Sequence, residues 1–178
     1  MVGCAINGTI LLSMGRSYAG VSANTSGSYI PQTNTVASGT VSSFNQQKHG
    51  AGSACYRPIP TDPFPNDLPL LVTVGGTTLN NLFYPPDSMA LSNVFEIYTG
   101  GSTNSVITGA NLPANIYYPA IEFSYTLRRA FVFGGATAVN TPSSDVYSVS
   151  IVGSGNAWTK VASMPVPRFG HKVVILSR

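Results

Sequence analysis

Charged side chains are scarce in this sequence. Nine Lys and Arg and six Asp and Glu make up 8% of its 178 residues and give a formal net charge of +3, whereas an average soluble domain is about 25% charged. The basic residues are scattered singly apart from Arg128-Arg129, so the chain lacks a basic stripe that could neutralise a run of phosphates. The sequence therefore predicts no nucleic-acid partner.

Long hydrophobic runs are also missing. No apolar run reaches the length of about 18 residues that a membrane-spanning helix needs. The apolar start, residues 1–14, is interrupted by Asn7-Gly8 and lacks the basic region with which a signal peptide begins. We expect no membrane insertion and interpret this start as part of the mature protein.

Residues that commonly catalyse reactions or bind metals are few and scattered. His49 and His171 are the two histidines, and the six acidic residues are isolated in the sequence. A metal site usually takes three or four ligands from His, Cys, Asp or Glu. The chain also has no Gly-x-Ser-x-Gly elbow, phosphate-binding loop or Cys-x-x-Cys pair. The sequence therefore predicts no catalytic residue, no metal ligand and no cofactor.

Only two cysteines are present, Cys4 and Cys55. One disulfide between them would agree with a secreted protein, because disulfides persist in oxidising compartments. Two buried free thiols are the alternative, since unpaired cysteine packs as a small hydrophobic residue. The sequence leaves both interpretations open.

Glycine, proline and short apolar runs are abundant instead. The chain has 18 Gly, 13 Pro and 43% hydrophobic residues, and its apolar residues alternate or form short β-branched and aromatic runs, as strands do. Asn7-Gly8 separates two such runs, residues 2–6 and 9–14, and favours a tight turn between paired strands. The sequence predicts an all-β fold.

The later two thirds of the chain resemble each other. Residues 70–76, 93–97 and 111–113 resemble residues 130–135, 145–149 and 163–165. The last two pairs share an offset of 52 residues, whereas the glycine pairs lie 59 residues apart because of a longer loop at 79–90. A weaker first unit ends at His49-Gly50, with His49 at the position of His171. Such self-similarity indicates stacked structural repeats.

The last of these units resembles the kelch repeat. The residues that carry the resemblance are the strand 131–133, Gly134-Gly135, Asp145-Val146-Tyr147, Trp158, Met164-Pro165, Arg168 and Gly170-His171. The preceding unit keeps Gly75-Gly76 but has Val106 near the Trp position and Tyr118-Pro119 at the Arg and Gly-His positions. The resemblance implies kelch-like β-propeller blades, each a four-stranded antiparallel sheet.

The residues of the repeat are expected to have structural roles. The pairs Gly75-Gly76 and Gly134-Gly135 let the backbone pass close to the neighbouring blade where no Cβ would fit. Tyr147 and Trp158 supply large apolar faces that pack one sheet on the next. We expect the side chains of Arg168 and His171 to donate hydrogen bonds to loop carbonyls between blades.

The chain holds about three such blades, in approximate units 1–56, 57–125 and 126–178. Kelch-like propellers usually have about six or seven blades, and a ring of four is about the smallest. Both terminal strands, 2–6 and 172–176, are expected to fall inside a repeat. We expect either a part of a larger propeller or a ring that neighbouring subunits complete.

Several loops are expected to carry partners or modifications. Asn7 and Asn24 lie in N-glycosylation triplets, and Asn24 is the better acceptor because it is placed in a polar loop, whereas Asn7 sits in a tight turn. The segments 17–43, 58–69 and 79–90 are long for a compact β-domain, and long ordered loops often bind partners.

The sequence as a whole predicts a binding or scaffold module without enzymatic activity, secreted or on the cell surface. Its partner would be a protein or a glycan, or further copies that complete a ring or build a fibre. Galactose oxidase shares the kelch-like propeller, so a copper radical oxidase with a Tyr-Cys crosslink is one alternative. An intracellular kelch adaptor is another, which the sparse charge argues against.

Overall fold

A computed structural model describes residues 2–6, 9–16, 22–38, 50–58, 70–77, 91–99, 106–152 and 157–176. Among these residues every regular element is a β-strand. The predicted all-β fold is therefore confirmed. The strands form three four-stranded antiparallel sheets and one two-stranded ribbon, which is the arrangement expected of propeller blades.

The first sheet is a simple meander. It consists of β1 (Val2–Ile6), β2 (Thr9–Arg16), β3 (Ser22–Ile30) and β4 (Thr35–Ser38), in that order. Ile6 pairs with Thr9 across the Asn7-Gly8 dipeptide, which confirms the predicted strand pairing there. Asn7 and Gly8 themselves lie outside the described residues.

The second and third sheets repeat this meander. The second consists of β5 (Gly52–Tyr56), β6 (Leu70–Val74), β7 (Phe95–Thr99) and β8 (Val106–Thr108). The third consists of β9 (Ala120–Ser124), β10 (Arg129–Phe133), β13 (Asp145–Ser150) and β14 (Thr159–Ser163), and the ribbon β11 (Ala136–Ala138) and β12 (Thr141–Pro142) lies between β10 and β13 in sequence. The strands have the same order in each sheet, so the repeat seen in the sequence corresponds to a repeat of the sheet in the structure.

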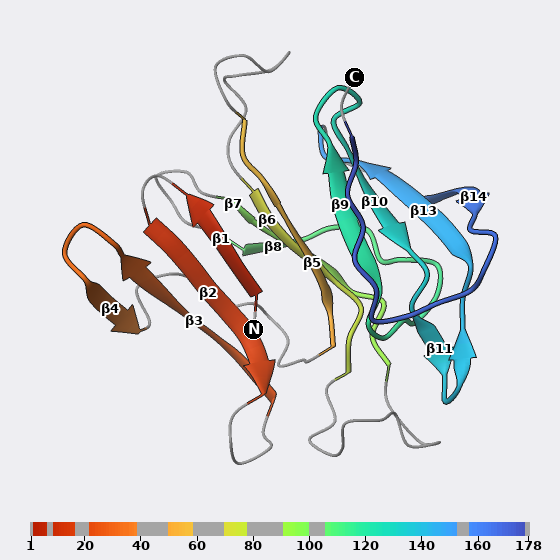
Figure 1. Ribbon diagram of the computed structural model, residues 1–178, viewed down its shortest axis with the longest axis horizontal. Coiled ribbons are helices and arrows are strands. Elements are labelled where there is room, and N and C mark those ends of the chain that lie inside the picture. The colour runs from red at the N-terminus through yellow and green to blue at the C-terminus, as the bar shows by residue number, and fades with distance from the viewer. Residues whose placement is uncertain are drawn as a thin grey trace.

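The three sheets follow one another as blades of an arc (Figure 1). β1 lies beside β5, and β5 lies beside β9, so the first strands of the sheets are neighbours. The sheets are out of phase with the predicted units by one strand. Gly52–Tyr56 falls in unit 1–56, yet it pairs with β6, and β9 falls in unit 57–125, yet it pairs with β10.

The core described for the molecule lies between the second and third sheets. Val72, Val74 and Phe95 of the second sheet belong to one buried cluster with Ile121 and Phe123 of the third. Burial alternates along β10, where Ala130 and Val132 are fully buried and their neighbours are half-buried. One face of the third sheet is therefore the inner wall of this core, because successive side chains of a strand point to opposite faces.

The strand pairings correct one part of the predicted alignment. Val74 pairs with Phe95, and Phe133 pairs with Val146. Because Val74 and Phe133 each precede a glycine pair, Phe95 corresponds to Val146, at an offset of 51 residues rather than the predicted 52. The offset of 52 does hold for Leu112 and Met164, whose N–H groups donate to corresponding carbonyls. The stretch from Val146 to Met164 is thus one residue longer than the stretch from Phe95 to Leu112, as loops allow.

Candidate functional site

The paired glycines hold each sheet against the segment that leads to the next. The φ angles are 70° and 90° at Gly75 and Gly76 and 56° and 97° at Gly134 and Gly135, a region in which residues with a Cβ are strained. Gly76 N donates to Ile116 O at 2.7 Å, and Gly135 N donates to Arg168 O at 2.9 Å. A Cβ on Gly75 would lie 2.5 Å from Ile116 O, so these positions admit only glycine without a shift of the backbone.

Trp158 bridges the second and third sheets. Its indole is 7% exposed, packs edge-on against Phe95 with ring centroids 5.1 Å apart, and donates from Nε1 to Ala110 O at 2.9 Å. Buried tryptophan usually needs such an acceptor for its N–H. Trp158 therefore fixes the third sheet on the second through both packing and a hydrogen bond.

Tyr147 belongs to a polar group on β13 and β14. Its hydroxyl donates to Asp145 Oδ2 at 3.1 Å, and Lys160 Nζ lies 2.6 Å from Asp145 Oδ1. The hydrogen bond from Lys160 holds the pKa of Asp145 below its usual value, and the same pairing raises the pKa of Lys160. Burial, followed by the carboxylate, raises the pKa of Tyr147. The group ties two neighbouring strands together.

Arg168 and His171 do not make the predicted side-chain bonds between blades. Among the described residues, Arg168 Nε donates within its own loop, to Val166 O at 3.4 Å, while the Arg168 backbone carbonyl accepts the bond from Gly135 N. Both ring nitrogens of the half-buried His171 lack a hydrogen-bond partner among the described residues. Burial, and then the charge of Arg168, lowers the pKa of His171. Backbone groups make the bridging bonds, so the side chains are not needed for them.

The alignment of His49 with His171 was also wrong. Gly50 and Gly170 have φ angles of 65° and 66°. Tyr118 N donates to Gly50 O, and Gly170 N donates to Tyr118 O, so the three residues occupy equivalent positions that are joined one to the next by the same backbone hydrogen bond. Ala51, rather than His49, is thus the residue that corresponds to His171. His49 lies outside the described residues.

Cys55 is disulfide-bonded, and Cys4 is the only other cysteine in the chain. The neighbouring positions of β1 and β5 bring the two strands that carry these cysteines together. The alternative of a free thiol at Cys55 is therefore wrong. Cys55 of β5 therefore carries a covalent crosslink.

The predicted modification sites and loops are placed differently. Asn24 lies within β3 rather than in a loop, at a register irregularity between β2 and β3, because a Ser- and Thr-rich strand has no apolar alternation to reveal it. Asn7 lies outside the described residues. So do residues 59–69 and 78–90, which contain almost all of two predicted binding loops.

The candidate site is the face of the third sheet that points away from the second, here called the open face. It was not singled out by the sequence. Phe131, Phe133 and Val146 lie on this face and correspond to Val72, Val74 and Phe95 by strand pairing. In the second sheet these three positions are at most 2% exposed, because the third sheet covers them.

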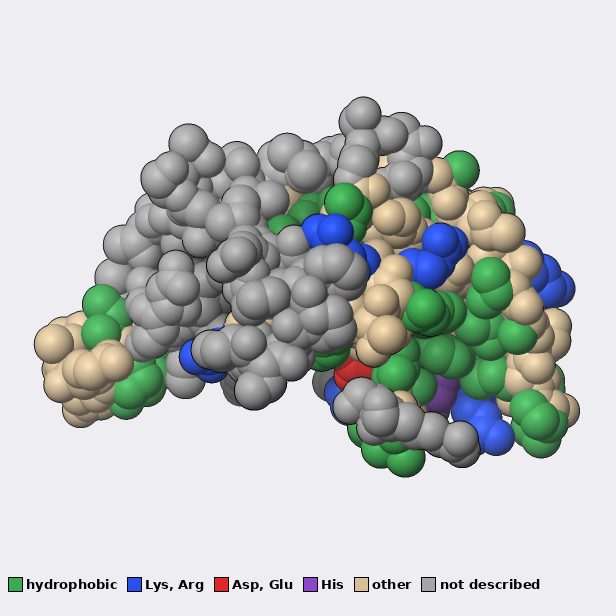
Figure 2. Space-filling view, turned by 90° about the horizontal axis from the view of Figure 1, so that it is seen from above, with side chains coloured by type: hydrophobic (Ala, Val, Ile, Leu, Met, Phe, Trp, Pro, Cys, Tyr) green, Lys and Arg blue, Asp and Glu red, His purple; other side chains and the backbone are tan. Residues whose placement is uncertain are grey.

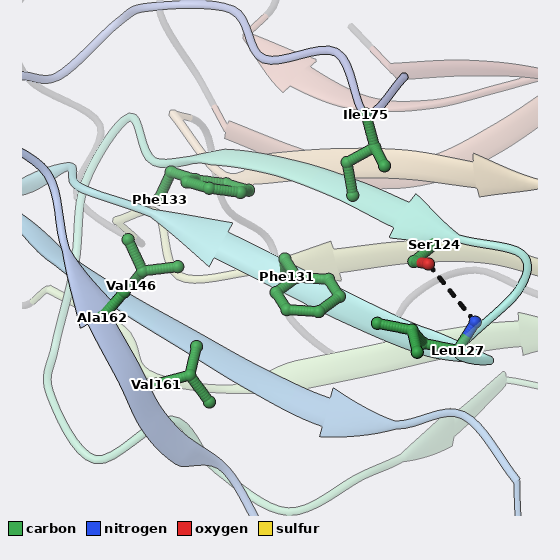
Figure 3. Close-up of a pocket in the computed structure, with 8 residues that line it drawn as sticks. All are labelled: Ser124, Leu127, Phe131, Phe133, Val146, Val161, Ala162 and Ile175. Carbon is green, nitrogen blue, oxygen red and sulfur yellow. Dashed lines mark hydrogen bonds between the residues drawn. The ribbon is translucent and has the colours of Figure 1, made fainter. Parts of the chain in front are cut away.

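A pocket of about 310 Å³ lies on the open face. Figure 3 shows the side chains that line it: Ser124, Leu127, Phe131, Phe133, Val146, Val161, Ala162 and Ile175. Seven of these eight are apolar, and the hydroxyl of Ser124 already accepts from Leu127 N at 3.3 Å. The pocket therefore suits another apolar surface, because it offers little hydrogen bonding to a polar ligand.

Exposed hydrophobic side chains concentrate around this face. Leu127, Val161, Val174 and Leu176 are 61%, 49%, 74% and 84% exposed. Figure 2 shows hydrophobic side chains gathered over the end of the molecule that carries the third sheet. Exposed apolar side chains beside a pocket, such as Leu127 and Val161 here, commonly mark an interaction site.

Two further properties of the described residues bear on the site. No three His, Cys, Asp or Glu side chains in this part of the chain are grouped so that they could hold a metal ion. No helix among the same residues is long and apolar enough to cross a membrane.

Comparisons with known proteins extend only to the fold. No family model matches the sequence, and no curated protein matches it. The structure is similar to the solved structure of a protein named YjhT, with a TM-score of 0.68 and 12% identity over 94% of this chain. The chain spans about half the length of YjhT, 52%. A single fold can support many unrelated functions. The structural similarity is therefore evidence for the architecture of this chain and not for its function.

Proposed function

We propose that this protein is a kelch-like binding module without enzymatic activity, which assembles with a protein partner through the open face of its third sheet. The observation that carries the proposal is the pocket lined by Phe131, Phe133 and Val146. Their counterparts in the second sheet are fully covered by a neighbouring blade. Covering this surface is favourable by about 25 cal/mol per Å² of apolar area.

The same proposal places the protein outside the cell. The disulfide at Cys55 supports this location, because disulfides are rare in reducing compartments. The low content of charged residues, 8%, agrees with a surface kept in solution by hydroxyl and amide groups. A binding module of this kind could equally take a glycan as its ligand, bound through the loops of the blades.

Site-specific photocrosslinking tests the binding surface. A photoreactive phenylalanine analogue is placed at Val161, which lines the pocket, or at Val36, which is 73% exposed on the first sheet. The protein is returned to the extracellular fluid of its source and irradiated. We expect one discrete protein adduct from position 161 and none from position 36. Equal labelling at both positions would contradict binding through the open face.

Copper analysis separates this proposal from the oxidase alternative. One equivalent of copper per chain, together with a mass corresponding to a tyrosine crosslinked to Cys55, would support a copper radical oxidase. The disulfide at Cys55 argues against that crosslink. A thiol at Cys55 in freshly isolated protein would instead favour the intracellular adaptor.

A further inference from the structure

One position of the structural repeat is glycine in two places and tyrosine in the third. Tyr118 N donates to Gly50 O at 2.7 Å, and Gly170 N donates to Tyr118 O at 2.9 Å, so the three residues are equivalent. Their φ angles are 65° at Gly50, 49° at Tyr118 and 66° at Gly170. All three adopt the left-handed conformation, which glycine takes up readily and which is strained for a bulky residue.

The backbone at position 118 therefore favours glycine, yet the chain has tyrosine there. The equivalent position on each side of it, Gly50 and Gly170, is occupied by glycine. Bulky residues in strained conformations persist where the surrounding structure holds them, and they cluster at binding and active sites. The reason for tyrosine at this position has to be sought in what its side chain presents.

The ring of Tyr118 is supported at the surface by the tyrosine that precedes it. Tyr117 is 1% exposed, whereas Tyr118 is 38% exposed. The two ring centroids lie 4.2 Å apart, with an angle of 52° between the ring planes. The ring of Tyr117 in turn occupies the space that a Cβ on Gly50 would need. The buried ring thus holds the exposed one, which offers a flat aromatic surface to a ligand.

Two segments beside Tyr118 carry no charge. Tyr118 belongs to the connection 109–119, and the N and O atoms of Tyr117 bond to Ala136 O and N at 2.9 and 2.7 Å, which places this connection beside the segment 134–144. β11, in the second segment, lies at the end of the third sheet from which β9 begins (Figure 1). Neither segment contains a charged residue. Their exposed polar side chains are amides and hydroxyls: Asn111, Asn115, Thr137, Asn140 and Thr141.

The third segment that adjoins Tyr118 is basic. Among residues 163–172 the charged ones are Arg168 and Lys172, and Arg168 Nε donates to Val166 O at 3.4 Å. Two of the three adjoining segments are thus uncharged, which favours a neutral ligand. Comparison with an anionic ligand measures the contribution of the basic segment.

We propose that Tyr118 is a binding residue for a neutral carbohydrate, whose sugar ring stacks on the tyrosine ring while its hydroxyl groups bond to segments 109–119 and 134–144. The C–H groups on one face of a pyranose ring form an apolar surface that suits an aromatic ring. Sugar hydroxyls both donate and accept, as the amide and hydroxyl side chains of these segments do. None of these residues lines the pocket on the open face, so this site goes beyond the proposed function and is tested separately.

A printed array of neutral and anionic oligosaccharides tests the inference. We expect the full chain to bind at least one neutral oligosaccharide, and titration calorimetry with that compound to show saturation. An anionic oligosaccharide of matched length should bind at least about tenfold more weakly. Binding confined to anionic oligosaccharides would assign the site to the basic segment, and it would overturn the inference. Binding of no oligosaccharide would overturn it as well.

Two glycine variants separate a binding role from a structural one. Tyr118→Gly removes the ring and supplies the residue that the backbone favours. We expect it to weaken binding of the neutral oligosaccharide at least about tenfold, while the midpoint of urea unfolding stays at or above that of the wild type. A lower midpoint would show that the tyrosine serves the fold, which would overturn the inference.

Arg128→Gly is the matched control. Arg128 has a φ of 50° and lies beyond the opposite end of β9, so this variant also replaces a residue in the left-handed conformation by glycine. We expect the urea midpoint to change in the same direction and oligosaccharide binding to stay within about twofold of the wild type. A loss equal to that of Tyr118→Gly would mean that the effect does not come from the tyrosine ring.

Tyr118→Phe keeps the ring and should weaken oligosaccharide binding less than about threefold, since the face of the ring makes the stacking contact. Crosslinking at Val161 is measured on the same preparations. Absence of oligosaccharide binding with retained crosslinking would refute only this inference. Loss of crosslinking with retained oligosaccharide binding would refute only the proposed function.

Discussion

The glycine positions of the repeat differ in what surrounds them, which makes their roles separable. Gly135 has a φ of 97°, and a Cβ there would lie 2.5 Å from Ile116 Cγ1, whereas Gly170 has a φ of 66° with nothing within 4 Å of its Cβ position. Backbone strain applies to both residues, while overlap with a buried side chain applies to Gly135 alone.

We therefore expect Gly135→Ala to lower the free energy of unfolding by about 2–5 kcal/mol, as the sum of left-handed strain and overpacking. Gly170→Ala should lower it by about 1–2 kcal/mol, from strain alone. Urea unfolding of the two variants measures both changes. An equal loss would mean that contact with Ile116 is not what requires glycine at 135.

His171 makes stability depend on pH in a defined direction. Its pKa is lowered by burial and by Arg168, so the folded protein resists protonation of this side chain. Above the ordinary histidine pKa of about 6.5 the group is neutral in both states and has no effect. As the pH falls below that value, the unfolded chain binds a proton that the folded chain does not, and the free energy of unfolding decreases.

We expect His171→Gln to reduce the loss of stability between about pH 7.5 and about pH 5, since the variant has no titrating group at this position. Urea unfolding at the two pH values, for wild type and variant, gives the comparison. His49 is present in both proteins and does not contribute to the difference. Parallel losses in the two proteins would show that His171 is not the group responsible.

At the scale of the strand, the disulfide at Cys55 crosslinks β5. The pairing predicted from the sequence, Cys4 with Cys55, closes a loop of about fifty residues, for which chain entropy predicts a stabilisation of about 4 kcal/mol. We expect Cys55→Ser to lower the free energy of unfolding by about 2–4 kcal/mol. Ser53→Ala, on the same strand, is the control and should change it by less than about 1 kcal/mol. No difference between Cys55→Ser and wild-type protein under non-reducing conditions would be inconsistent with a disulfide in the folded chain.

At the scale of the whole molecule, the difference between the two faces of the third sheet determines which surface is available for binding another protein. One face is closed by the second sheet through Trp158 and Phe95, and the opposite face carries the pocket. The molecule therefore presents an apolar surface at one end that resembles its own interior.

We expect this surface to bind a hydrophobic fluorescent dye such as anilinonaphthalene sulfonate in the native state. Leu127→Asn, at a pocket residue that is 61% exposed, should reduce the enhancement of fluorescence at least about twofold, because it removes apolar area from the pocket. Val36→Asn, which removes a similarly exposed residue of the first sheet, should leave the signal unchanged. Equal reductions in both variants would show that the dye does not report on the pocket.

The sequence by itself determined the all-β class and many of the strands and turns, but it predicted a loop at 17–43, where β3 and β4 lie. Alternation of apolar residues, the Asn7-Gly8 turn and the glycine pairs are local signals, because they depend on side-chain periodicity and on the φ angles that only glycine adopts readily. The kelch-like resemblance of residues 131–171 depends on the same signals. The all-β class and the blade repeat followed from them.

Only the tertiary structure decided which side chains are covered and which remain open. Phe131 and Phe133 have the same sequence pattern as Val72 and Val74, yet one pair lines a pocket and the other is fully buried. The sequence also did not predict three further findings: the offset of 51 residues, the strand position of Asn24 and the absence of a hydrogen-bond partner for His171 among the described residues. Each depends on strand register or on a neighbouring blade, and a side chain's own sequence context does not contain the surface that packs against it.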